Sequence, residues 1–181
     1  FAGAKGSSRI AANASGFRTD GISAWASGSE RDGYENVTFD LAAEHRINEA
    51  FSVFGSLLHI NAKGEYDNWG SDSLVNRNTA AITGGRAGFD LDFLDGQLKN
   101  RFSVQATRVD REDFGDNPGI FLGEKLKFDY QGAFAATDRV LLQYGVDHER
   151  QEVDDAGGST PLGKTDLTGI WAQAVVEPVD N

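Results

Sequence analysis

The sequence predicts an all-β fold, a single antiparallel up-and-down sheet of the kind that closes into a transmembrane β-barrel. Three observations lead to this prediction. Apolar and polar residues alternate with a period of two over most of the 181 residues. The connections between these alternating segments run long, short, long, short along the chain. The segments have about 12–17 residues, whereas strands of globular sheets usually have about five or six.

The alternation predicts eight strands. In one of them, Phe102 and Val104 alternate with Arg101 and Ser103, so that one face is apolar and the other is polar. The expected strands are Ser7–Arg18, Gly33–Arg46, Phe51–Asp67, Asn78–Leu94, Leu98–Arg111, Leu122–Ala135, Arg139–Glu152 and Asp166–Glu177.

The connections between these strands indicate how the sheet is oriented. Alternate turns of an up-and-down sheet lie at the same end, so one end carries only tight turns and the other only long loops, as in outer-membrane barrels. Crossing the hydrocarbon takes only about 9–11 residues, and the longer strands predict a sheet that projects above the membrane. The tight turns are Ile47–Ala50, Asp95–Gln97 and Ala136–Asp138; the long loops are Thr19–Asp32, Asn68–Arg77, Glu112–Phe121 and Val153–Thr165.

The composition excludes several classes of protein. The net charge of -11 disfavours a nucleic-acid-binding protein, which is usually basic. There is no cysteine, so neither a disulfide framework nor a thiolate metal site is expected. The first ten residues lack the regions of a signal peptide, and the chain contains no methionine. We therefore interpret it as a processed or truncated piece of a longer protein.

Two alternatives fit part of the pattern. A soluble β-rich binding module has half-buried sheets that alternate in the same way. A self-contained eight-stranded outer-membrane barrel with a structural or adhesive role has an even strand number that can close. Strand length and the aromatic residues near the predicted strand ends disfavour the soluble module. An open wall of eight strands would leave two unpaired edges, which another part of the protein would have to cover.

Several short motifs resemble a known family. The glycine-flanked Phe17 is followed by Thr19, Asp20 and Gly21, the returning strand opens with Asp32-Gly33-Tyr34, and a later segment reads WAQAVVEP (Trp171–Pro178). These motifs resemble the barrel of TonB-dependent outer-membrane receptors, and in particular their cobalamin (vitamin B12) branch. The resemblance implies a 22-stranded barrel closed by a plug domain. Residues 1–181 would supply about eight of its strands as a single partial barrel domain without the plug.

The resemblance also implies a function. Such receptors import a scarce, bulky nutrient, here a cobalamin-like compound, a siderophore or another metal chelate, across the outer membrane of a Gram-negative bacterium. The implied partners are outer-membrane lipid, the rest of the barrel with its plug, the TonB system and the nutrient. No enzymatic activity is expected. His45, His59 and His148 lie on three different strands without the spacing of a catalytic or metal site.

The resemblance implies a calcium site, since some members of the cobalamin branch bind calcium in their first extracellular loops. Calcium prefers six to eight oxygen ligands, which clustered carboxylates supply. The alternative is an acidic loop that is merely solvated. The candidate ligands are Glu30, Asp32, Tyr66, Asp67 and Asp72.

Two further groups of residues are candidates for function. Trp25 and Trp69 lie in long loops, where they would either stack on a flat nutrient or pack as interfacial aromatic residues. A set of polar residues would line the lumen and hold a plug through contacts that can be broken and remade; the alternative is a solvated sheet face. This set is Lys99, Arg101, Lys125, Lys127, Asp129 and Gln131.

Overall fold

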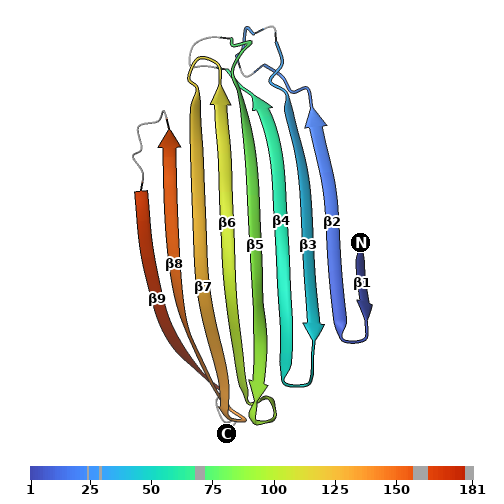
Figure 1. The fold of residues 1–181 in the computed structure, drawn as a ribbon, viewed down its shortest axis with the longest axis vertical. Helices are drawn as coiled ribbons and strands as arrows, with labels where there is room; N and C mark the ends of the chain where they lie inside the picture. The colour runs from blue at the N-terminus through green and yellow to red at the C-terminus, as the bar shows by residue number, and fades with distance from the viewer. Residues whose placement is uncertain (24, 29, 68–71, 157–162, 178–181) are drawn as a thin grey trace.

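The computed structural model describes residues 1–23, 25–28, 30–67, 72–156 and 163–177. They form one nine-stranded antiparallel sheet in which every strand pairs with the next along the chain (Figure 1). The all-β, up-and-down fold class is confirmed. The elements are β1 (Ala2–Lys5), β2 (Ser8–Thr19), β3 (Tyr34–Arg46), β4 (Phe51–Glu65), β5 (Arg77–Phe93), the short 3-10 helix η1 (Leu94–Gly96), β6 (Leu98–Phe114), β7 (Gly119–Thr137), β8 (Val140–Ala156) and β9 (Gly163–Val176).

The strand number is nine, so the prediction of eight was wrong by one. The strand that was missed, β1, has only four residues and pairs with β2 from Ala2 opposite Ala11 to Lys5 opposite Ser8. Its sequence, AGAK, contains no β-branched or aromatic residue and is too short for alternation to be detected. The other eight strands appear where the alternation predicted them.

The ends of the sheet differ as the connection lengths predicted, with one correction: the predicted long loop Glu112–Phe121 has only the four residues Gly115–Pro118, because β6 and β7 extend into it. Every tight turn lies at one end of the sheet, and the loops after β2, β4 and β6 lie at the other (Figure 1). The motif Thr19-Asp20-Gly21 marks the exit from β2 into the first long loop. The Gly21 N–H donates to Oγ1 of Thr19 at 3.0 Å. Gly21 has a φ of +64°, and a Cβ there would lie 1.9 Å from the Asp32 carbonyl oxygen, so this exit requires glycine.

The described residues form a single layer with no apolar core. Among them, no apolar side chain is buried, and the one buried residue is Asn76, which is 2% exposed. A soluble sandwich needs a second sheet packed on the first, and the described residues supply none. In the same residues β1 and β9 are the two edges of the sheet and do not pair with each other. The described part of the chain also contains no helix that is long and apolar enough to span a membrane.

The cross-strand register divides the side chains between two faces. Phe102 of β6 lies opposite Tyr130 of β7, and the face that carries them is called the apolar face. Arg101 lies opposite Gln131 on the other side of the sheet, which is called the polar face. A row is a set of residues that pair directly with one another from strand to strand.

Candidate functional site

The apolar face carries an apolar band that is interrupted by Asn100 on β6 and Thr83 on β5. On β6 it runs from Leu98 to Ala106, and the next residue on this face is the charged Arg108. These nine positions correspond to about 30 Å along the strand, or about 23 Å of height if the strand is tilted by about 40°. The corresponding runs on the other strands are Ile10–Gly16, Val37–Ala43, Phe51–Leu57, Ala81–Phe93, Leu126–Phe134, Val140–Val146 and Ile170–Val176.

The edge of this band that faces the long loops is called the upper edge, and it crosses the strands diagonally. It lies at Gly16 on β2 and at Ile170 on β9, but the row through Ile170 reaches β2 at Ser8, eight residues below Gly16. Eight residues correspond to about 26 Å along a strand, and the seven spacings between β2 and β9 to about 34 Å across the sheet. An apolar layer with this slope makes an angle of about 40° with the rows, which is the strand tilt of membrane barrels.

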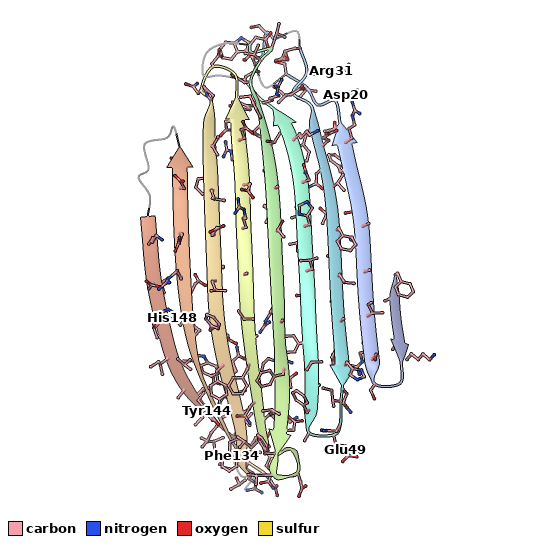
Figure 2. The ribbon with its side chains drawn as sticks, viewed as in Figure 1. Asp20, Arg31, Glu49, Phe134, Tyr144 and His148 are labelled. Carbon is pink, nitrogen blue, oxygen red and sulfur yellow. The ribbon has the colours of Figure 1, made fainter. Side chains whose placement is uncertain are left out.

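Aromatic side chains follow one another across the tight-turn side of the band. The ring of Phe102 stacks on Phe89 with a centroid distance of 5.0 Å and on Tyr130 with a distance of 4.6 Å. The Tyr130 hydroxyl donates to Oδ1 of Asn100 at 2.8 Å, on the side of the tight turns. Figure 2 shows Tyr144 and Phe134 at this end of the sheet. Aromatic rings with a polar tip are enriched at membrane–water interfaces.

Charged residues replace the apolar ones above the band. Nε of Arg108 lies 2.8 Å from Oδ2 of Asp110, and its Nη1 lies 2.9 Å from Oε1 of Glu124. Nε of Arg150 lies 2.8 Å from Oδ1 of Asp166. Arg108–Glu124 and Arg150–Asp166 are exposed cross-strand pairs, which stabilise a sheet by about 0.2–1 kcal/mol each, whereas Arg108–Asp110 joins two residues of β6. The apolar face is therefore apolar only over the height of the band, and the strands continue beyond it as a water-compatible sheet.

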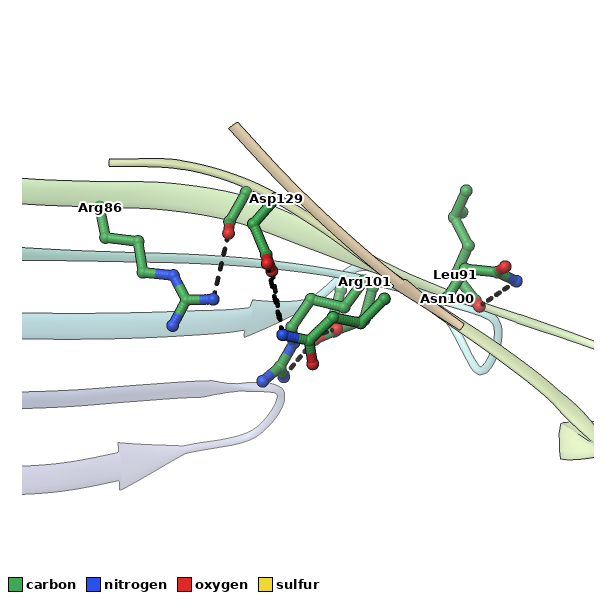
Figure 3. Close-up of polar contacts among 9 residues, drawn as sticks. Arg86, Leu91, Asn100, Arg101 and Asp129 are labelled. Atoms are coloured by element: carbon green, nitrogen blue, oxygen red, sulfur yellow. Dashed lines mark hydrogen bonds and ion pairs between the residues drawn. The ribbon is translucent and has the colours of Figure 1, made fainter. Parts of the chain in front are cut away.

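The polar face holds the six residues that were predicted to line a lumen. Arg101 donates from Nε to Asp90 at 2.7 Å, and Nζ of Lys127 lies 3.2 Å from Oδ2 of Asp147. Gln131 donates to Oδ1 of Asp129 at 3.1 Å, and Figure 3 shows the contacts of Arg101 and Asp129 side by side. The register places the whole set on one face: Lys99, Arg101, Lys125, Lys127, Asp129 and Gln131.

An aromatic ring interrupts this polar wall. The guanidinium carbon of Arg101 lies 4.8 Å from the ring centroid of Phe54, and that of Arg86 lies 5.5 Å from it. The ring itself covers Gly88, where a Cβ would come within 2.5 Å of it. Two guanidinium groups over one ring gain cation–π attraction, about 0.5–1 kcal/mol each at exposed sites. The sequence already indicated that this strand is apolar on both faces from Phe54 to Ile60, but not that the Phe54 ring would lie against two arginines.

The sheet is hollowed on its polar face near the tight turns. A hollow of about 400 Å³ is lined from seven successive strands, β3 to β9. Its lining includes Glu44, Asp90, Lys99, Gln143 and Trp171. This hollow brings charged and polar side chains of seven strands around one wet space on the polar face.

Three of the predicted calcium ligands meet in the long loops. Carboxylate oxygens of Glu30, Asp67 and Asp72 all lie within 4.8 Å of one another. Asp67 is held by the backbone, since Oδ2 accepts the Trp25 N–H at 2.7 Å and Oδ1 accepts the Ser73 N–H at 2.9 Å. Both Glu30 oxygens are shielded from solvent and accept no hydrogen bond from the described residues.

The clustered charges perturb two of these carboxyl groups. The Asp72 carboxylate, which can share a proton with Glu30, and then the loss of hydration raise the pKa of Glu30 to about 7. The Ser73 N–H, and to a smaller extent the Trp25 N–H, hold the pKa of Asp67 below its usual range despite partial loss of hydration. Asp67 therefore stays ionised. The Glu30 carboxylate lies close to two other carboxylates, and a proton or a bound cation relieves the repulsion between them.

The remaining predicted loop residues lie differently. Asp32 is not part of the three-carboxylate group, although it borders a hollow of about 180 Å³ together with Glu30. Tyr66 is placed by its backbone, whose N–H donates to the Asn76 carbonyl at 3.2 Å. Trp25 is 38% exposed, and its backbone is tied to Asp67. Trp69 lies outside the described residues.

Asn76 connects two long loops, and sequence reasoning did not identify it. Its Oδ1 accepts the Asp116 N–H at 2.9 Å, which joins the loop after β4 to the loop after β6. Gly115 makes room for it, because a Cβ there would lie 2.2 Å from the Asn76 Oδ1. An isolated asparagine in a loop gives no signal of this kind until the register of the strands brings the loops together.

Comparison with known proteins finds a solved structure with a similar fold but no matching family. No family model and no curated protein sequence matches the chain. Among solved structures, BauA, the ferric preacinetobactin receptor from Acinetobacter baumannii, has a similar fold, with a TM-score of 0.69 and 12% sequence identity. The match covers 97% of this chain and 36% of that receptor, so the chain spans about a third of its length. At this identity the likeness concerns the fold alone.

Proposed function

We propose that this chain is a wall segment of an outer-membrane receptor of the TonB-dependent kind, whose apolar face contacts lipid and whose polar face lines the lumen. The observation that carries this proposal is the diagonal apolar band. A soluble sheet has no reason to end its apolar residues eight residues lower on β9 than on β2; the descent is uneven, because the run on β4 already ends at Leu57. A membrane imposes such an offset on tilted strands, because the hydrocarbon layer is flat.

The polar face supports the lumen part of the proposal. Its charges are largely paired within the wall, as in the Lys127–Asp147 pair at 3.2 Å. A second domain inside the lumen would then contact a hydrated surface whose charges are largely paired, and not an apolar surface that binds it tightly. The rest of the barrel would cover the free edges of β1 and β9, which would otherwise promote association.

The long loops are the proposed place of nutrient binding. The loops after β2, β4 and β6 are linked by the contacts of Asp67 and Asn76 and form one connected surface at the end of the sheet. Such loops on a rigid scaffold are the usual position of binding residues. The likeness to a ferric siderophore receptor favours a metal chelate over a cobalamin-like nutrient as the cargo.

A calcium ion held by Glu30, Asp67 and Asp72 belongs to the same proposal. The residues fit a hard cation, because three carboxylates converge and the Glu30 oxygens have no donor among the described residues. The ion would neutralise the repulsion between these carboxylates and fix the loop after β2 against the loop after β4. Loop geometry, rather than any bond-making step, is what it would supply.

The lipid-facing part can be tested with single cysteines, since the natural chain has none. In the protein reconstituted in vesicles, a bimane label at Val104→Cys should be quenched by lipids with brominated acyl chains. A label at Gln105→Cys, the next residue on β6 but on the polar face, should not be quenched. Equal quenching at the two positions would contradict the proposal. Equilibrium titration with a ferric siderophore and with a cobalamin, followed by Trp fluorescence with Trp25→Phe as control, tests the cargo.

A further inference from the structure

A recess rich in cationic side chains lies on the apolar face directly above the band, where β2 to β5 meet the loops. Its volume is about 720 Å³. Arg18, Glu35, Lys63 and Thr79 occupy one row of the sheet. The lining from the sheet includes Arg18, Glu35, Lys63, Arg77, Thr79 and Phe114, and the lining from the loops includes Asp20 and Arg31.

The charge of the recess is opposite to that of the protein. Four cationic side chains face three anionic ones, a net of plus one, in a chain whose net charge is -11. One of the three, Glu65, already accepts the Gly33 N–H at 3.0 Å. The recess is therefore a local site of attraction for anions on an otherwise acidic surface.

Two of the cationic groups are not engaged by a carboxylate. Lys63 lies 3.2 Å from Glu35, and Arg31 lies 3.8 Å from Asp20. Within the described part of the chain, Arg18 makes no ion pair or hydrogen bond, and the guanidinium of Arg77 only stacks over a ring, 4.9 Å from the Phe114 centroid. Guanidinium groups present a fork of donors that matches phosphate geometry.

Below the recess this face is exposed and apolar on β2, β3 and β5, whereas on β4 the polar Asn61 and His59 lie between Lys63 and the band. On β2, β3 and β5 the band rises to Gly16, Val37 and Ala81, the residues just beneath the row of Arg18. Val37 is 62% exposed and Phe39 is 41% exposed. A soluble anion would use only the charges, whereas an amphiphile would use the charges and this apolar surface together.

We infer that the recess binds the phosphorylated head group of a membrane lipid, with Arg18 and Arg77 on opposite sides of the head group and the acyl chains along the band below. This inference rests on the proposed contact of the apolar face with lipid. It adds a specific lipid site, on one side of the wall, to what would otherwise be uniform solvation by the membrane.

The test uses the whole chain in phosphatidylcholine vesicles with and without phosphatidic acid, and native mass spectrometry to count the retained lipid. The natural protein should retain phosphatidic acid in preference to phosphatidylcholine. The double variant Arg18→Gln/Arg77→Gln should weaken this retention by roughly tenfold or more. The control is Arg108→Gln, which is matched to the single variant Arg18→Gln: it removes one charge from the apolar face, but from a guanidinium already paired with Asp110 and Glu124.

The outcomes separate the inference from the proposed function. Insertion into phosphatidylcholine vesicles without preference for phosphatidic acid would overturn the lipid site alone, and failure to insert into any vesicle would overturn the proposed function. An equal loss in Arg108→Gln would show charge attraction without a site. Full displacement by excess inorganic phosphate would show an anion site that does not use the acyl chains, and would also overturn the inference.

The single variant Arg18→Gln shows whether weaker lipid retention arises from loss of the site or from misfolding. Its side chain contacts no described residue through a polar interaction, so the change leaves the sheet intact. Weaker retention in this variant supports the site, and unchanged retention in both Arg18→Gln and Arg77→Gln contradicts it.

Discussion

Leu126 of β7 and Arg150 of β8 lie directly opposite each other in one row of the sheet, yet Leu126 is the last residue of the apolar band on its strand and Arg150 is charged. The guanidinium of Arg150 turns instead toward Asp166 of β9, at 2.8 Å. This change of character within a row is a direct consequence of the diagonal edge of the band. Under the proposed contact with lipid, this change of character follows from the flat hydrocarbon layer that tilted strands cross.

A positive charge inside the band should be costly in a membrane. Val104→Arg places a guanidinium inside the run on β6, two residues from its centre at Phe102, and should lower the free energy of unfolding in lipid by about 2–4 kcal/mol. The measurement is reversible denaturant unfolding of the protein in vesicles. The control is Gln105→Arg, the adjacent residue on the polar face, which should change stability by less than about 1 kcal/mol. Equal effects of the two variants would exclude lipid contact of the apolar face.

The junction between the loops after β4 and β6 should depend on Asn76. Its replacement by alanine removes the acceptor of a half-buried hydrogen bond from the Asp116 N–H, which costs about 0.5–1.5 kcal/mol. Because the loss is local, hydrogen exchange at Asp116 should accelerate while exchange in the strands stays unchanged. Acceleration spread evenly over β5 to β7 would mean that Asn76 supports the sheet and not the loops.

A glycine pair tests the same junction from the other side. Gly115 has a φ of +104°, and a Cβ there would overlap Asn76, so Gly115→Ala should loosen the junction as strongly as Asn76→Ala. Gly119, four residues later, has open space around it and should tolerate alanine. Hydrogen exchange of Asp116 reads out both variants, and equal behaviour of the two would contradict the described contact.

The strand rhythm was predictable because it depends on local alternation. Val104 and Gln105 differ in polarity because they face different surroundings, and a period of two reveals this without any knowledge of the neighbours. The short strand Ala2–Lys5 was not predictable, because its pairing depends on β2 and not on its own side chains. The slope of the apolar band needs the register between strands, which no single segment contains.

Calcium binding to the loops should depend on pH. Glu30 has its pKa raised to about 7, so below that pH a cation must displace a proton before it binds. Affinity should rise by roughly tenfold per unit as the pH increases toward 7 and should level off above it. Without calcium the sign is opposite: the folded state binds the extra proton between the ordinary pKa of a glutamate and about 7, so loop stability falls as pH rises.

Calorimetry at pH values of about 6 and about 8 measures this dependence. The variant Glu30→Gln should bind calcium more weakly and lose the pH dependence, because the proton that competes with the ion is gone. A variant outside the group, Asp95→Asn in a tight turn, serves as the charge-matched control. A pH dependence that persists in Glu30→Gln would assign the titration to another residue.

The candidate site was only partly predictable for a similar reason. Alternation alone placed Arg101 and Lys127 on one face, and the register then showed their partners Asp90 and Asp147. Position in the loops suggested five oxygen donors, but the fold brings together three, because the backbone N–H groups of Ser73 and Trp25 orient Asp67. Contacts between loops arise from the strands that carry them, and no local pattern encodes them.

Phe39 of β3 and Glu124 of β7 test the central claim most directly, because they lie in one row of the sheet on the same face. A nitroxide label at each position, in the protein in lipid vesicles, reports its exposure to oxygen, which concentrates in lipid, and to a nickel chelate, which stays in water. The account predicts that the label at Phe39 is relaxed mainly by oxygen and the label at Glu124 mainly by the nickel chelate. Equal relaxation of the two labels by either reagent would contradict a tilted, lipid-facing band.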